Sequence, residues 1–113
     1  MEIRMIGEDG TVFTCDDIEM LAMGTHGQAG IECPYAKLVA LFGEPRAGDE
    51  FKTQAEWTVY TPAGIATIYD WKQGDSYHGK GNGTPVEDVT DWSIGGHDKQ
   101  VAEWILKAVN KTA

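Results

Sequence analysis

The chain has 113 residues, of which 18 are acidic and 9 are basic, so its formal net charge at pH 7 is −9. This length fits a single domain, residues 1–113, that buries an ordinary core without metal or disulfide support. The acidity argues against a protein that wraps nucleic acid in a basic groove, because phosphate contacts need clustered Lys and Arg.

The N-terminal part predicts a hairpin, a short helix and a loop. Residues 2–6 and 11–15 flank Glu8-Asp9-Gly10, and the Asp-Gly pair favours a tight hairpin turn. The acidic segment 16–23 then favours a short helix that begins with an aspartate cap and ends at Gly24. Residues 24–30 contain three glycines and show little periodicity, which indicates a loop.

The next segment predicts a second short helix. Pro34 fits the first helical position, and Gly43 followed by Glu44-Pro45 is a stop signal. Between these signals lies an apolar face made by Tyr35, Leu38, Val39, Leu41 and Phe42.

The centre of the chain carries the strongest strand pattern. Residues 53–60 and 65–71 are rich in β-branched and aromatic side chains, and Thr61-Pro62-Ala63-Gly64 separates them. They should pair as an antiparallel hairpin. Alternation predicts a sheet with one covered side, with Ala55, Trp57 and Val59 on one face and Glu56, Thr58 and Tyr60 on the other.

The C-terminal part predicts a loop, a strand and a helix. Residues 73–86 are rich in glycine, which fits either a flap over a ligand or a disordered tip. Residues 90–94 should form a third strand beside the hairpin, and residues 98–110 should form a helix whose buried stripe includes Val101, Trp104 and Ile105. The expected fold class is α+β: a small twisted antiparallel sheet of about four to five strands, packed by two helices.

The junction between the last strand and the closing helix is a candidate seat for an anion. Gly95, Gly96 and His97 precede the helix, whose first N–H groups have no partner within it and carry partial positive charge. Glycines also allow a phosphate to approach the backbone closely. The alternative is that the glycines only make the turn and that Asp98 caps the helix.

Aromatic and cationic residues suggest a site for an anionic ring compound. Trp57, Trp71 and Trp92 fall on or beside three successive predicted strands, where they either stack a base or fill the core, the latter above all for Trp57. Five possible cations lie between positions 43 and 81 and predict a positive patch, unless they are solvated surface residues: Arg46, Lys52, Lys72, His78 and Lys80. Arg46 is notable because a guanidinium binds phosphate in a bidentate manner.

The pattern of cysteines and histidines gives little support to metal or cysteine chemistry. Cys15 and Cys33 lie far apart, and the three histidines are equally dispersed, so we expect no metal site and no cofactor. The cysteine usage and the lack of a long apolar N-terminal run indicate a reduced, cytoplasmic protein without membrane association.

Two other functions compete with ligand binding. Residues 1–43 contain seven acidic and only two basic residues, and Asp16, Asp17 and Glu19 are among the acidic ones. This acidic surface either mimics DNA in the basic groove of a partner protein or serves solubility. Asp70 and Asp91, with a histidine, are candidates for acid–base cleavage of a phosphodiester, or are simply lysine partners and turn caps.

Several strings resemble a pattern in small bacteriophage proteins: residues 66–72 (ATIYDWK) and 92–96 (WSIGG), preceded by residues 41–45 (LFGEP) and by Glu56-Trp57. The resemblance covers about residues 35–105 and leaves out the acidic N-terminal third. Such proteins often serve counter-defence, and one class, the nucleotide sponges, binds immune signals such as ADP-ribose derivatives or cyclic oligonucleotides without cleaving them.

The resemblance implies immune evasion in the host cytoplasm through sequestration of a small anionic nucleotide-like ligand. It also implies a homo-oligomer, because sponges commonly bind their ligands at subunit interfaces. The expected ligand-binding residues are Arg46, Trp71, Lys72, His78, Trp92, Gly95, Gly96 and His97. The acidic inhibitor of a protein and the nucleotide-cleaving enzyme are the alternatives.

Overall fold

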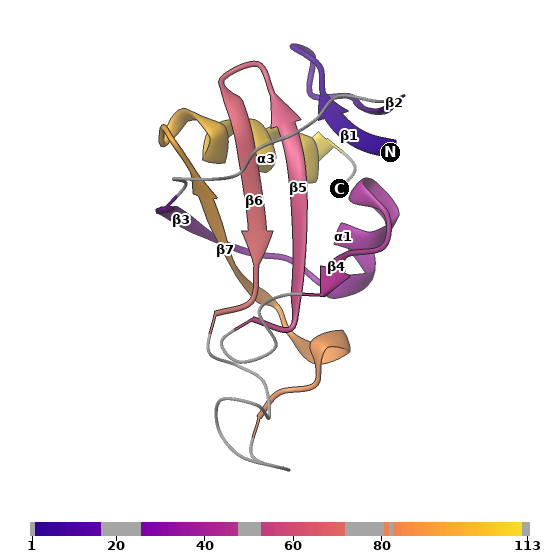
Figure 1. The fold of residues 1–113 in the computed structure, drawn as a ribbon, viewed down its shortest axis with the longest axis vertical. Coiled ribbons are helices and arrows are strands. Elements are labelled where there is room, and N and C mark those ends of the chain that lie inside the picture. Colours follow the sequence, from indigo (N-terminus) through magenta and orange to yellow (C-terminus); the bar gives the residue numbers. More distant parts are fainter. Residues whose placement is uncertain (1, 17–25, 48–52, 72–80, 82, 112–113) are drawn as a thin grey trace.

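The computed structural model describes residues 2–16, 26–47, 53–71, 81 and 83–111 (Figure 1). Its elements in chain order are β1 (Glu2–Ile6), β2 (Val12–Asp16), β3 (His26–Glu32), α1 (Tyr35–Phe42), β4 (Arg46–Ala47), β5 (Ala55–Thr61), β6 (Gly64–Tyr69), the 3₁₀ turn η1 (Val86–Asp88), β7 (Asp91–Gly96) and α3 (Gln100–Lys111).

The described strands form one mixed sheet in the order β2-β1-β5-β6-β7-β3, and the two-residue β4 pairs with β5. The α+β class and the two helices agree with expectation. The expected antiparallel sheet of four to five strands is too small, because β3 and β4 were not foreseen as strands. The sheet is also mixed, because β1 lies parallel to β5, with Arg4 beside Val59 and Met5 beside Tyr60.

Both predicted hairpins are present. In the first, Gly10 has a φ of 84°, and the Asp9 carboxylate accepts a hydrogen bond from the Thr11 N–H at 2.9 Å, so the turn uses both residues of the Asp-Gly pair. In the second, Thr61 pairs with Gly64 across a two-residue turn, and every pair down to Glu56 and Tyr69 follows in register.

The predicted loop at residues 24–30 is wrong over its described part. Residues from His26 onward form β3, which pairs antiparallel with β7 and changes register between Gly27 and Ala29. Glycine weakens a strand but does not forbid it when a neighbour supplies the backbone partners. The short helix expected at residues 16–23 lies outside the described residues, except for Asp16, which ends β2.

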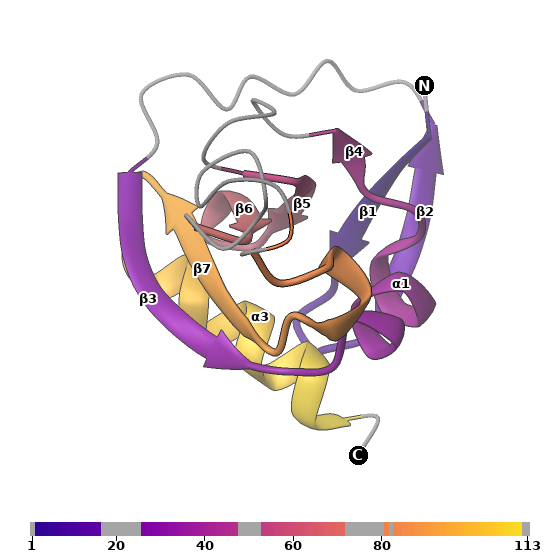
Figure 2. The same cartoon turned by 90° about the horizontal axis from the view of Figure 1, so that it is seen from below.

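Helix α3 crosses one face of the sheet and covers the core. In Figure 1 it lies behind the β5–β6 hairpin, and Figure 2 shows β3 and β7 on one side of this hairpin and β1 and β2 on the other. The predicted stripe of α3 is confirmed, with Val101 and Ile105 fully buried and Trp104 partly buried against the core. Neither described helix combines the length and apolarity that crossing a membrane would require.

The aromatic centre of the core joins α1 to the sheet. The Trp57 and Trp92 rings meet edge to face at 5.2 Å, and Tyr35 of α1 contacts both. Each indole N–H has a carbonyl acceptor: Trp57 Nε1 donates to the Gly43 carbonyl at 2.7 Å and Trp92 Nε1 to the Cys33 carbonyl at 2.9 Å. The structural role expected for Trp57 is therefore correct.

Candidate functional site

The sheet face opposite α3 carries a line of side chains set by strand register. Directly opposed residues in an antiparallel ladder project from the same face. Arg46 opposes Glu56, Glu56 opposes Tyr69, Tyr69 opposes Ser93, and Ser93 opposes Gly30. We call these five residues the cross-strand row; it brings one cation, one carboxylate and one phenol onto a single face.

Trp71 extends the aromatic part of this row. Its ring lies 6.2 Å from the Tyr69 ring at an interplanar angle of 78°, and 46% of the residue is exposed. Two rings at this angle form a corner that presents one accessible face to a ligand. The predicted ring-binding role therefore has an accessible residue in Trp71.

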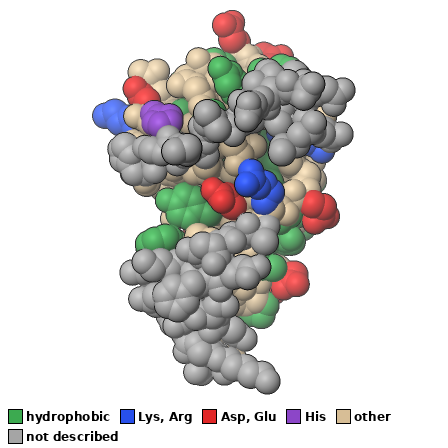
Figure 3. All heavy atoms as spheres, viewed as in Figure 1, with side chains coloured by type: hydrophobic (Ala, Val, Ile, Leu, Met, Phe, Trp, Pro, Cys, Tyr) green, Lys and Arg blue, Asp and Glu red, His purple; other side chains and the backbone are tan. Residues whose placement is uncertain are grey.

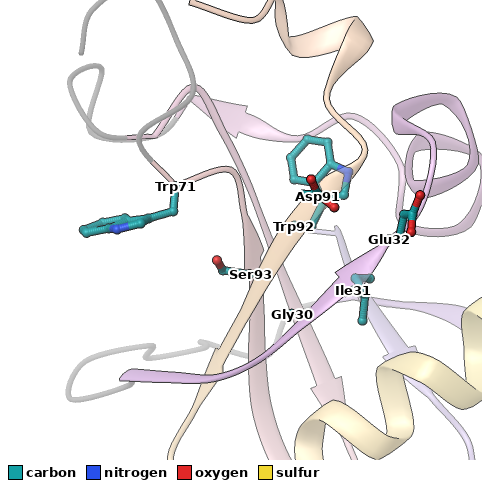
Figure 4. A pocket seen from close by; sticks show the side chains of 7 residues that line it. All are labelled: Gly30, Ile31, Glu32, Trp71, Asp91, Trp92 and Ser93. Carbon is teal, nitrogen blue, oxygen red and sulfur yellow. The ribbon is translucent and has the colours of Figure 1, made fainter. Parts of the chain in front are cut away.

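A hollow of about 460 Å³ lies next to this corner, between Trp71 and the paired strands β3 and β7. Figure 4 shows Trp71 on one side, Asp91 and Glu32 on the other, and Ser93 between them. Glu32 and Asp91 are themselves directly opposed across the ladder, so their carboxylates share the face of the cross-strand row. The volume falls in the range typical of small-ligand sites.

The electrostatics of the face are mixed. Figure 3, which views this side of the molecule, shows acidic, basic and hydrophobic side chains next to one another near its centre. Burial, followed by the charge of the nearby Glu56 carboxylate, raises the pKa of Tyr69. The phenol therefore keeps its proton at neutral pH and is available as a hydrogen-bond donor.

The expected anion seat at Gly95 and Gly96 is not formed as a turn. Both glycines lie inside β7, where they pair with Thr67 and Ala66 on β6 and with residues 27 and 26 on β3. Their backbone is thus enclosed by ladder neighbours on both sides, and both residues are buried. The sequence pattern could not separate a glycine at a turn from a glycine in a central strand.

Gly96 has a packing role instead. A Cβ atom built on it would lie 2.5 Å from Cγ2 of Val101 and 3.2 Å from the Ile65 carbonyl oxygen, so only glycine lets α3 lie this close to β7. The alternative proposed for this junction is confirmed at Asp98, whose carboxylate accepts a hydrogen bond from the Gln100 N–H at 2.8 Å.

The other expected ligand-binding residues separate into three groups. Trp92 is 2% exposed and belongs to the core, although it is also one of the residues that line the hollow. His97 is exposed beyond the end of β7, away from the residues that line the hollow. Lys72 and His78, like Lys52 and Lys80, lie outside the described residues.

Among the described residues, the two aspartates considered for catalysis lie in different surroundings. Asp70 is fully buried and accepts hydrogen bonds from the Gln54 backbone N–H, the Gln54 side-chain amide and the Ala55 N–H, at 2.7, 2.8 and 3.1 Å. Asp91 is exposed at the start of β7. Burial raises the pKa of Cys33, and the Lys37 charge offsets this only in part, so the thiol is poorly suited to act as a nucleophile.

No metal centre is formed by the residues whose positions are described: none of their His, Cys, Asp and Glu side chains gather in groups of three or more that could hold an ion. Sequence reasoning missed Glu32, Glu56 and Ser93 as site residues and considered Asp91 only for catalysis. The signal for Glu56 was present, because a two-residue turn after Thr61 places it opposite Tyr69.

Comparison with known proteins gives no relative: no family model, no curated protein and no solved structure matches the chain.

Proposed function

We propose that this protein binds a nucleotide-type ligand on the sheet face opposite α3 and holds it without chemical conversion. The observation that carries the proposal is the cross-strand row, which places Arg46, Glu56 and Tyr69 in line, with Trp71 against Tyr69. These residue types suit the three parts of a nucleotide: the aromatic rings suit a base, the carboxylate suits a ribose, and the guanidinium suits a phosphate.

Each part of such a ligand has a matching group. The Tyr69–Trp71 corner supplies a surface on which a base stacks. The Glu56 carboxylate is an acceptor for ribose hydroxyls, and the Arg46 guanidinium offers paired donors to a phosphate. Because neighbouring strands lie about 4.8 Å apart, the backbones of Arg46 and Tyr69 are separated by about 10 Å, which suits the span from a base across its ribose to a phosphate.

The biological role that we propose with this binding is sequestration of a nucleotide-derived immune signal in the host cytoplasm, as the resemblance to small phage proteins suggests. Two copies of the chain would deepen an open site of this kind, so a homo-oligomer is part of the proposal. Sequestration requires tight binding of a ligand that stays chemically unchanged, and it needs no catalytic group.

The direct test is thermal unfolding of the purified protein with a panel of ADP-ribose derivatives, cyclic dinucleotides and common nucleotides. A ligand at about a hundred times its Kd adds roughly 2.7 kcal/mol to the free energy of unfolding, a shift on the order of 10 °C. Chromatography of the released ligand should show it unaltered. A panel without any shift, or a ligand recovered as cleaved product, would overturn the proposal.

A matched pair of variants locates the site. Arg46→Ala removes a cation from the cross-strand row, and Lys99→Ala removes an exposed cation next to α3, on the other side of the molecule. Loss of a charge-assisted hydrogen bond should weaken binding about 10- to 100-fold for Arg46→Ala. Equal affinities of the two variants would show that the ligand binds elsewhere.

An acidic inhibitor of a basic protein is the second candidate, and one observation favours it. Among the described residues, nine exposed carboxylates stand against three exposed cations, and they are spread over the whole described surface: Glu8, Asp9, Glu32, Glu44, Glu87, Asp88, Asp91, Asp98 and Glu103. Binding of this kind would weaken steeply with salt and would survive Arg46→Ala and Trp71→Ala.

A further inference from the structure

We infer that two copies of this chain join edge to edge through β2, antiparallel and centred on Thr14, so that their sheets become one continuous sheet. This inference rests on the proposed function for the expectation of a homo-oligomer, and it adds the surface at which the two copies meet. Three observations carry it: β2 lies at an edge of the sheet, it directs backbone groups outward, and the Phe13 side chain is exposed there.

β2 is a regular edge strand. It pairs with β1 over its whole length without a change of register, and among the described residues the sheet has no strand beyond it. Figure 2 shows β2 at the end of the sheet away from β3. Proteins usually interrupt or charge their sheet edges, because unpaired N–H and C=O groups there attract other chains. The β3 edge is interrupted by its register change between Gly27 and Ala29, whereas β2 contains no bulge and no Lys, Arg, Pro or Gly.

The hydrogen bonds of the β1–β2 hairpin determine which groups of β2 face outward. The Gly7 N–H donates to the Thr11 carbonyl at 2.8 Å, so this pair is of the hydrogen-bonded kind. Hydrogen-bonded and non-hydrogen-bonded pairs alternate along an antiparallel ladder. Phe13 therefore bonds to β1, while Val12 and Thr14 direct their N–H and C=O groups away from it. Among the described residues, these outward groups make no backbone hydrogen bond.

A two-fold rotation makes this edge complementary to itself. When two β2 strands run antiparallel with Thr14 opposite its copy, the Thr14 N–H of each chain donates to the Thr14 carbonyl of the other. All five residues of the strand then have a partner, and Asp16 opposes Val12 instead of another acid. The rotation axis is perpendicular to the sheet, so both α3 helices lie on one face of the joined sheet and both cross-strand rows lie on the other.

An apolar row on the sheet face opposite α3 ends at this edge. Strand register sets its members side by side in the order Phe13, Met5, Tyr60 and Ile65. Phe13 is 43% exposed and Tyr60 is 37% exposed. Across the paired edge the two Phe13 residues are diagonal neighbours about 7–8 Å apart, which is within reach of aromatic side chains. Joining the copies therefore covers the more exposed end of the apolar row.

The charge of the edge favours a second copy over a basic peptide. The side chains of Thr11, Phe13 and Thr14 are exposed and uncharged, in a chain with a net charge of −9. A basic strand would find no carboxylate among these three residues to pair with, whereas a second acidic copy would meet no like charge among them. A contact of five residues a side is small, so the dimer should dissociate at micromolar concentrations.

Sedimentation equilibrium from about 1 µM to about 1 mM tests this inference with two substitutions of Thr14. Proline is tolerated in an edge strand where the N–H faces outward, so Thr14→Pro should keep the circular dichroism spectrum of the parent. We expect Thr14→Val to dimerise like the parent, and Thr14→Pro to associate roughly tenfold or more weakly, because each copy loses a donor. A monomeric parent, or equal association of parent and Thr14→Pro, would overturn the inference. Ligand binding by a monomer would leave the proposed binding function standing.

A disulfide cross-link tests the same register if proline prevents folding. In the paired edge the two Thr14 Cα atoms lie about 5.5 Å apart, a distance that a disulfide spans. In a chain that also carries Cys15→Ser, Thr14→Cys should therefore give a covalent dimer under mild oxidation, and a reductant should reverse it. Thr90→Cys in the same background is the matched control at an exposed position outside β2. Cross-linking no greater for Thr14→Cys than for Thr90→Cys would overturn the inference.

Discussion

The roles of the three tryptophans along the sheet are decided by their immediate partners. Trp57 and Trp92 pack edge to face and donate their indole N–H groups to buried carbonyls, which makes them structural. Trp71 follows the end of β6, where its ring contacts Tyr69 and about half of the residue meets solvent. Two of these tryptophans thus stabilise the core, and the third, Trp71, is accessible to a ligand.

Trp92→Phe should destabilise the protein by about 2 kcal/mol, since it leaves the Cys33 carbonyl without its indole donor and removes packed volume. Trp71→Phe should change stability by less than about 0.5 kcal/mol, because the site is half exposed. Urea unfolding followed by circular dichroism measures both. Equal losses would contradict the division into core and surface tryptophans.

Asp70 connects the start of β5 to the end of β6. Its buried carboxylate accepts two backbone N–H groups and the Gln54 amide, and that amide also donates to the Thr84 carbonyl at 3.0 Å. Asp70→Ala should therefore cost about 3 kcal/mol in urea unfolding, because it strands buried donors. Asp91→Ala is the matched control and should cost less than about 1 kcal/mol. A loss below 1 kcal/mol for Asp70→Ala would mean that water replaces the carboxylate.

Among the helices and strands, the correctly predicted ones are those whose sequence signals lie within a few residues of one another. The β5–β6 hairpin was correct because a two-residue turn fixes both pairing and facing, from Thr61 and Gly64 down to Glu56 and Tyr69. The α1 and α3 helices were correct because apolar spacing and stop signals lie within a few residues. The α+β class followed from these elements alone.

The misplaced elements depend on partners that lie far away in the chain. β3 has a glycine-rich sequence without alternation and is a strand because β7 pairs with it. The parallel contact between β1 and β5 joins segments that no local pattern relates. The hollow was missed for the same reason, since it requires Glu32 on β3 beside Asp91 on β7.

The contact between β7 and α3 gives a test at this scale. Gly96→Ala places a methyl group against Val101 and the Ile65 carbonyl, so it should destabilise the protein by about 2 kcal/mol. Val101→Ala in the same chain should recover part of this loss, and a double-mutant cycle in urea measures the coupling. Gly30→Ala is the control, because the nearest atom to its Cβ would be at an ordinary 3.5 Å. Strictly additive losses would contradict the steric explanation.

For the whole molecule, one buried thiol and two partly buried phenols should make the free energy of unfolding depend on pH in the alkaline range. Burial raises the pKa of Cys33, Tyr35 and Tyr69 above their ordinary values of 9.0 for the thiol and 10.0 for the phenols; nearby carboxylates contribute for both tyrosines. Above those values the unfolded chain releases protons that the folded chain keeps. The free energy of unfolding should therefore be constant near neutrality and fall from about pH 9 upward.

Guanidinium unfolding between pH 7 and pH 11 measures this dependence. Tyr35→Phe removes one of the three groups, so its stability should fall less steeply with pH than that of the parent chain. Identical slopes for the two proteins would show that Tyr35 has the same pKa in the folded and unfolded chain.

The order of strands in the sheet also bears on how the chain is made. Two of the first three strands to leave a ribosome, β1 and β3, take their places beside β5 and β7, which are synthesised much later. Closing such long loops is slow compared with forming a hairpin, so assembly should start at β5–β6 and spread outward to both edges. The N-terminal third must then wait, exposed to proteases and chaperones, until β7 has emerged, and nascent chains stalled before that strand should be degraded far faster than the finished protein.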